Sequence, residues 1–257
     1  MGTTTSSRRH LAEIADPWLS TTVTFPAGRI GPPGMVNGGW VSGTVAGHLG
    51  RGPVEVTLQA PTPPGVPLDL RVADDRATLG VDGTVLVAAR RAPGPLRAPA
   101  PVEPGEARAA VAGFGGWTEH PFPGCFVCGT DRLPHDGLRI FPGPVAGPPA
   151  AGGRPARVAA AFRPHPALAG PDGLLPPEAG WAALDCPTAW VHMRPGGVAL
   201  LGRLRAEVPG RLRAGETYQV VAERAGTDGR KAYGRGAIYD GGGRLVGASE
   251  AVWISVA

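Results

Sequence analysis

The residues Asn37-Gly38-Gly39 could form the start of a helix whose backbone N–H groups bind an oxygen atom. The first N–H groups of a helix have no acceptor within the helix, and they lie at the positive end of its dipole. Glycine lets a carbonyl oxygen approach these groups because no Cβ stands in the way, as in an oxyanion hole. We therefore predict Gly38 and Gly39 as catalytic N–H donors, with Asn37 as a cap and substrate-binding residue. The alternative is that both glycines serve only close packing of the helix.

Asp185 is the carboxylate that could act with these N–H groups, as a general base or as a nucleophile. It lies in a second small-residue segment, in which Glu178, Trp181 and Thr188 could contact a substrate, together with Trp40 of the first segment. Simpler explanations exist for each residue. Asp185 could cap a following turn that has Pro187 in its first positions. Glu178 could stabilise a helix by placing its carboxylate near the positive end of the dipole. Both tryptophans could be core residues.

Cys125 and Cys128 have the C-x2-C spacing of half a zinc site, but the chain has only one further cysteine, Cys186. His120, His135 or His192 could also complete a site, although no spacing in the sequence supports any of these residues. We therefore expect buried structural thiols, no metal and no cofactor. The chain lacks a phosphate-binding loop, a dinucleotide-binding glycine motif, HExxH and GxSxG.

Short alternating strands and one small-residue helix make up the first part of the chain. Residues 20–24, 54–58 and 68–72 read as strands, and residues 78–89 read as a hairpin around Asp82-Gly83. Between the first two strands, residues 37–49 have apolar residues near helical spacing. Three internal glycines would destabilise an exposed helix by about 1 kcal/mol each. We therefore expect a buried helix, with glycines that let the sheet backbone approach.

The same order of elements recurs in the last part of the chain. A strand at 158–162 precedes a second small-residue helix at 178–185, and strands follow at 200–208 and 217–222 before a final hairpin at 231–256. Gly39-Trp40 corresponds to Gly180-Trp181, and Asp82-Gly83 corresponds to Asp240-Gly241. This order indicates a duplicated domain. We expect halves at 1–95 and 157–257, joined by a connecting segment at 96–156 that contains Cys125 and Cys128.

Three stretches of this chain resemble the double-hotdog, type II acyl-CoA thioesterases. The NGGW stretch is similar to a Gly-Gly helix start of acyl-CoA thioesterases, and YGRGAIYDGGGRLVGASEAVW resembles the last hairpin of the type II family. The segment EAGWAALDCPTAW places Asp185 where that family carries a catalytic Asp. The family's Thr and Gln positions differ here, because they fall near Ala199 or Leu200 and at Val252.

The resemblance implies an α+β double hotdog, with two curved antiparallel sheets that each wrap around a central Gly-rich helix. It implies an acyl thioester hydrolase that acts on acyl-CoA or acyl carrier protein, through one site shared between the halves. The alternatives are a non-catalytic acyl-CoA- or lipid-binding protein that has lost the site, and a hotdog hydratase or dehydratase. The unit would be a monomer or a homodimer.

Composition excludes several other classes of protein. The 257 residues include 41 glycines and 30 prolines, but 42% are hydrophobic and no collagen period occurs. The net charge of +4 is spread along the chain, so we expect no nucleic-acid partner. No apolar segment is long enough for a membrane span, and residues 1–18 lack the apolar core of a signal peptide. Three cysteines form no closed disulfide set, which favours the cytoplasm.

Overall fold

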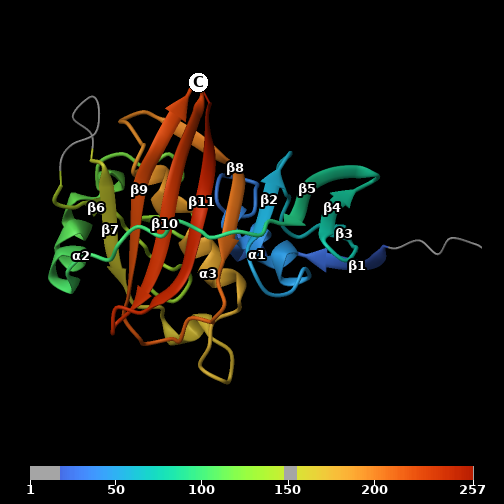
Figure 1. Cartoon of the computed structure of the whole chain (residues 1–257), viewed down its shortest axis with the longest axis horizontal. Helices are drawn as coiled ribbons and strands as arrows, with labels where there is room; N and C mark the ends of the chain where they lie inside the picture. Colours follow the sequence, from blue (N-terminus) through green and yellow to red (C-terminus); the bar gives the residue numbers. More distant parts are fainter. Residues whose placement is uncertain (1–17, 148–154, 257) are drawn as a thin grey trace, which may run out of the picture.

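One antiparallel sheet of eleven strands forms the framework of this computed structural model, which describes residues 18–147 and 155–256. The strand order is β1-β3-β4-β5-β2-β8-β11-β10-β9-β7-β6 (Figure 1). The strands are β1 (Leu19–Thr24), β2 (Val54–Leu58), β3 (Pro67–Val72), β4 (Arg76–Val81), β5 (Thr84–Arg91), β6 (Gly143–Pro144), β7 (Arg157–Phe162), β8 (Val198–Glu207), β9 (Tyr218–Asp228), β10 (Lys231–Asp240) and β11 (Leu245–Val256).

The expectation of two separate sheets is wrong, because β2 and β8 pair across the two halves. Their antiparallel register joins Val54 to Ala206 and Val56 to Leu204. Each half would otherwise present an unpaired strand edge, and pairing satisfies the N–H and C=O groups of both edges. The halves therefore share one continuous sheet.

Local sequence explains the individual strands. In β3, the side chains of Leu68 and Leu70 are buried while their neighbours face solvent, as expected for a strand with one buried face. The β4–β5 hairpin turns at Asp82 and Gly83, whose φ angles are +50° and +76°. Two consecutive positive φ angles define the tight turn that Asp-Gly favours. The predicted hairpin is thus confirmed.

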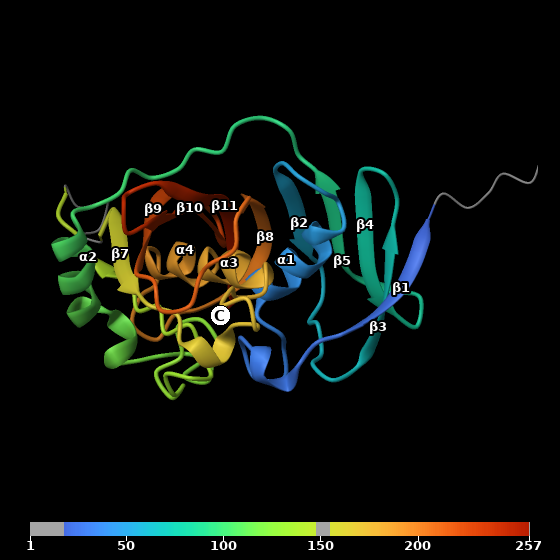
Figure 2. The same ribbon diagram turned by 90° about the horizontal axis from the view of Figure 1, so that it is seen from below.

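The central helices lie against one face of the sheet (Figure 2). The α-helices are α1 (Gly38–Gly47), α2 (Pro104–Ala110), α3 (Glu178–Ala183) and α4 (Cys186–Trp190), and short 3-10 helices cover 27–29, 111–113, 115–117 and 166–168. Helix α1 packs against α3 and against β2, β4 and β5, whereas α4 packs against β7, β9 and β10. The expected single helix at 178–185 is replaced by α3 and α4. Pro187 explains the break, because it cannot donate the N–H that would continue α3.

The glycines of α1 mainly allow close contact with α3, and only Gly38 meets residues of the sheet. A Cβ on Gly39 would lie 2.6 Å from the Trp181 carbonyl oxygen, and a Cβ on Gly43 would lie 2.9 Å from the Glu178 Cα. A Cβ on Gly38 would meet Leu201 and Leu58, from β8 and β2. Our expectation that these glycines serve sheet approach is therefore corrected for Gly39 and Gly43.

The connection between the halves crosses the sheet face opposite to α1, α3 and α4 (Figure 2). Arg205 of β8 donates hydrogen bonds to the carbonyl oxygens of residues 92–95, and the Tyr239 hydroxyl donates to the Pro99 oxygen at 2.6 Å. The segment then forms α2 and contributes β6, which pairs with β7. The connecting segment is therefore part of the sheet, and the proposed boundaries at 95 and 156 remain a prediction.

The main hydrophobic core draws on both halves and on the connecting segment. It includes Val41 and Val56, Leu204 and Ile238, and Phe126 of the connecting segment. No helix in 18–147 or 155–256 has the length and apolar character needed to cross a membrane. The expectation that the N-terminus is no signal peptide rests on residues 1–18, of which residues 1–17 lie outside the described residues.

Candidate active site

The Asp185 carboxylate reaches from the second half of the chain to the start of α1 in the first half. Its Oδ2 accepts a hydrogen bond from the Gly39 backbone N–H at 2.8 Å and another from Asn37 Nδ2 at 2.7 Å. Asp185 is 2% exposed, and its Oδ1 is buried with no hydrogen-bond partner in the described part of the chain. The structure therefore brings Asp185 together with Asn37 and Gly39.

Asn37 holds this arrangement by acting on two sides. Its Oδ1 accepts a hydrogen bond from the Trp40 N–H at 3.0 Å, which caps α1, while its Nδ2 donates to Asp185. The predicted cap is confirmed. The same side chain therefore contacts both the start of α1 and the Asp185 carboxylate.

The alternative explanation of Asp185 as a helix cap holds for its position and not for its side chain. Asp185 does precede α4, and Pro187 does stand in the first turn of that helix. However, the Asp185 side chain makes no capping hydrogen bond to α4. The carboxylate points instead to α1. The tight turn between α3 and α4 places it there.

Burial dominates the acid–base behaviour of Asp185. Burial raises the pKa of this carboxyl to about 7. The hydrogen bonds from Gly39 and Asn37 lower the pKa, and the neighbouring Cys125 sulfur raises it further. A carboxyl with a pKa near neutrality can both take up and release a proton in the same pH range.

The two predicted N–H donors have different surroundings. The Gly39 N–H is already occupied by Asp185. The Gly38 N–H has no acceptor among the described residues, and Gly38 lies on the wall of a cavity. The prediction of a two-amide oxyanion site is therefore reduced to one free amide, at Gly38.

This cavity lies between the two halves and has a volume of about 280 Å³. Its polar end contains Asn37, Gly38 and Asp185, with the sulfurs of Cys125, Cys128 and Cys186. The rest of the wall is mostly apolar and includes Met35, Leu58, Met193, Leu200, Leu201, Trp253 and Ile254. An apolar cavity with a few polar groups at one end suits a ligand that carries a hydrocarbon chain next to a polar group.

Four residues predicted to bind substrate lie outside the cavity wall. Trp40 and Trp181 are each 7% exposed and belong to the core, where Trp40 packs edge-on against Phe126 with ring centroids 5.3 Å apart. Glu178 begins α3 beside Gly43. The simpler structural explanations fit these three positions.

Thr188 contacts the site indirectly. Its hydroxyl donates to the Asp185 carbonyl oxygen at 2.6 Å and accepts from Trp253 Nε1 at 2.8 Å. Trp253 lines the cavity. Thr188 therefore supports both a cavity residue and the backbone of Asp185, without lining the cavity itself.

Sequence reasoning missed that all three cysteines lie beside Asp185. The Cys125 and Cys186 sulfurs are 3.7 Å apart, although the residues are separated by 61 positions. Metal-site motifs are recognised from ligands that lie close together in the sequence, and Cys186 is far from Cys125. The one signal in the sequence that Cys186 lies near the site is that it directly follows Asp185. His120 also lines the cavity, but its Nε2 binds the Cys128 oxygen and its Nδ1 accepts the Phe122 N–H.

Comparisons with known proteins find matches in structure and none in sequence. No protein-family model matches the chain, and no curated protein matches it in sequence. Solved structures do match. The TesB protein of Mycobacterium avium subsp. paratuberculosis has 15% identity and a TM-score of 0.57, and the match covers 95% of this chain and 96% of that chain.

Two further solved structures agree with this match. A conserved protein of unknown function with a hot dog fold, from Alicyclobacillus acidocaldarius, has 16% identity and a TM-score of 0.57, with 95% and 94% of the two chains covered. The acyl-CoA thioesterase II TesB2 of Mycobacterium marinum has 14% identity and a TM-score of 0.50, with 87% and 91% covered. At these identities the likeness concerns the fold. The chain therefore has a double-hotdog fold like that of the type II thioesterases.

Proposed function

We propose that this protein hydrolyses acyl thioesters at the cavity between its two halves. The observation that carries the proposal is the Asp185 carboxylate of one half, hydrogen-bonded to the start of α1 of the other half, in the wall of a mostly apolar cavity. The printed name of one structural neighbour, the acyl-CoA thioesterase II of Mycobacterium marinum, supports the same reaction class. The acyl chain would occupy the apolar part of the cavity.

In the proposed reaction, Asp185 Oδ1 takes a proton from a water molecule, because this oxygen has no partner in the described residues while Oδ2 is held by Asn37 and Gly39. The water oxygen forms a bond to the carbonyl carbon of the thioester. The carbonyl oxygen accepts a hydrogen bond from the free Gly38 N–H. The C–S bond then breaks, and the thiolate takes the proton from Asp185. The products are a carboxylic acid and a thiol.

The test is thiol release from a panel of acyl-CoA and acyl carrier protein thioesters, which also identifies the carrier. We expect Asp185→Asn to lower kcat by about 10²–10⁴-fold, because the amide keeps an acceptor for Asn37 and Gly39 but cannot take up the proton. Asp172→Asn is the matched control, since Asp172 is an exposed aspartate that pairs with Arg211 away from the cavity. Equal rates for wild type and Asp185→Asn would remove Asp185 from the mechanism.

A second candidate is an acyl-CoA-binding protein without hydrolysis. It is favoured by the occupied Gly39 N–H and by the apolar residues Ala199 and Leu200 in the cavity wall. In that case acyl-CoA would raise the unfolding temperature without thiol release. A ligand at 100 times its Kd stabilises a protein by about 2.7 kcal/mol. Size-exclusion chromatography would decide between a monomer and a homodimer. We also propose a cytoplasmic location.

A further inference from the structure

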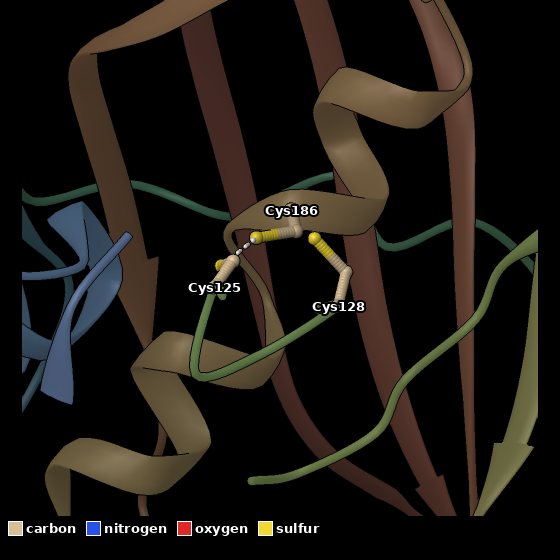
Figure 3. A group of neighbouring side chains, drawn as sticks. All are labelled: Cys125, Cys128 and Cys186. Atoms are coloured by element: carbon tan, nitrogen blue, oxygen red, sulfur yellow. Dashed lines mark hydrogen bonds between the residues drawn. The ribbon is translucent and has the colours of Figure 1, made fainter. Parts of the chain in front are cut away.

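Three cysteine sulfurs converge at the wall of the cavity. Cys125 and Cys128 come from the connecting segment and point toward Cys186 at the start of α4 (Figure 3). Their sulfurs all lie within 4.8 Å of one another, and all three residues are buried and free of disulfides. These are also the only cysteines of the chain. Two segments that are distant in sequence thus place all three thiols next to one another.

The turn that carries Cys125 and Cys128 is built to hold two sulfurs on one side. The Gly129 N–H donates to the Cys125 oxygen at 2.9 Å, which folds the chain back on itself. A Cβ on Gly129 would lie 2.4 Å from that oxygen, so only glycine fits here.

The surroundings fix this turn in place. The Phe126 N–H donates to the Ile30 oxygen, and the Ile140 N–H donates to the Val127 oxygen. The His120 ring holds the Cys128 oxygen at 2.9 Å. Both ring nitrogens of His120 are therefore engaged, so the histidine supports the turn instead of offering a fourth ligand.

We propose that Cys125, Cys128 and Cys186 bind one zinc ion. Zinc–sulfur bonds of about 2.3 Å place the sulfurs of a tetrahedral site about 3.8 Å apart, and the Cys125–Cys186 distance is 3.7 Å. Thiolate ligands favour zinc over hard cations such as magnesium and calcium. Because all three cysteines line the cavity, the fourth position is left to a ligand that enters from the cavity.

The site joins three parts of the molecule. A bound zinc ion would link the connecting segment to α4. Asp185 directly precedes α4, so its carboxylate lies next to the site. Asn37 Nδ2 lies 3.9 Å from the Cys186 sulfur, so the first half also touches the site. This proposal is independent of hydrolysis, because a non-catalytic protein could bind zinc in the same way.

The test is direct metal binding by the full chain. Protein stripped with a chelator and kept in a non-thiol reductant is titrated with Zn²⁺ and, separately, with Co²⁺. We expect one zinc ion per chain by elemental analysis, a rise in unfolding temperature with Zn²⁺, and thiolate-to-cobalt charge-transfer absorption with Co²⁺. Cys186→Ser and Cys128→Ser should lose these signals. Met193→Leu should keep them, because Met193 is another sulfur residue of the same cavity wall.

Two outcomes would overturn the proposal. One is the absence of cobalt charge-transfer absorption and of zinc retention in the reduced wild type, a readout that needs no variant to fold. The other is a Cys125–Cys186 disulfide in the isolated protein, seen as a loss of two hydrogens by mass spectrometry, together with no metal uptake after reduction.

Discussion

Asn37, Asp185 and Thr188 form a short chain of hydrogen bonds from α1 to the wall of the cavity. Asn37 holds the Asp185 side chain, and Thr188 holds the Asp185 backbone and the Trp253 indole. All of these residues are buried. Buried polar groups are costly when they lose a partner, so each member of the chain contributes to stability as well as to the geometry of the site.

Replacement of Thr188 by valine should test this chain. We expect Thr188→Val to lower the free energy of unfolding by about 1–3 kcal/mol, because the buried Trp253 N–H loses its acceptor. Urea denaturation followed by tryptophan fluorescence measures the effect. Thr84→Val, at an exposed position of β5, is the control and should change stability little. An equally small effect at Thr188 would contradict the structural role assigned to its hydroxyl.

At the scale of elements, the contact between α1 and α3 decides where Asp185 lies. Glycine at 39 and 43 lets the two helices approach, and α3 then ends at a turn that directs the carboxylate back toward α1. The same glycine that permits close packing donates its N–H to the carboxylate. Packing and site geometry therefore depend on each other at this contact.

Two alanine substitutions in α1 should have opposite effects. In Gly39→Ala, the added Cβ would lie 2.6–2.8 Å from Trp181 O, Asp185 Cβ and Ala182 Cα, and we expect a loss of about 1–3 kcal/mol from overpacking. Gly47→Ala meets nothing within 4 Å and should stabilise the helix, by up to about 1 kcal/mol. Thermal and urea unfolding of both variants provide the measurement. Similar changes in both would argue against the close contact.

Local features of the chain were predictable from its residues, whereas only one contact between distant segments was expected, that of Asp185 with the start of α1. Asp82-Gly83 identified a hairpin, and Asn37 identified the start of a helix, because turn and cap chemistry act over a few residues. The break at Pro187 carried a signal that we used only for capping. The β2–β8 pairing and the approach of Cys186 to Cys125 depend on tertiary packing, for which spacing in one sequence contains no rule.

At the scale of the whole molecule, the two halves form one structural unit. The sheet continues from β2 to β8, and Glu55 of β2 pairs with Arg90 of β5 at 2.7 Å and with Arg203 of β8 at 3.6 Å. The main core contains residues from both halves. The cavity between the halves is therefore lined by parts of one continuous framework.

This continuity predicts a single cooperative unfolding transition. Leu204→Ala, at a fully buried position of β8 opposite Val56, should lower stability by about 2–5 kcal/mol and shift far-UV and near-UV circular dichroism together. Leu245→Ala is the control, since Leu245 is 46% exposed. Two separate transitions, with only one shifted by Leu204→Ala, would show that the halves unfold independently.

The segment at 92–103 also has a consequence for biosynthesis. Its partners Arg205, Gln219 and Tyr239 follow it by more than a hundred residues. During translation the segment leaves the ribosome well before any of them has been made. It can settle onto the outer face only after most of the second half has been synthesised, so its docking belongs to the last stage of maturation.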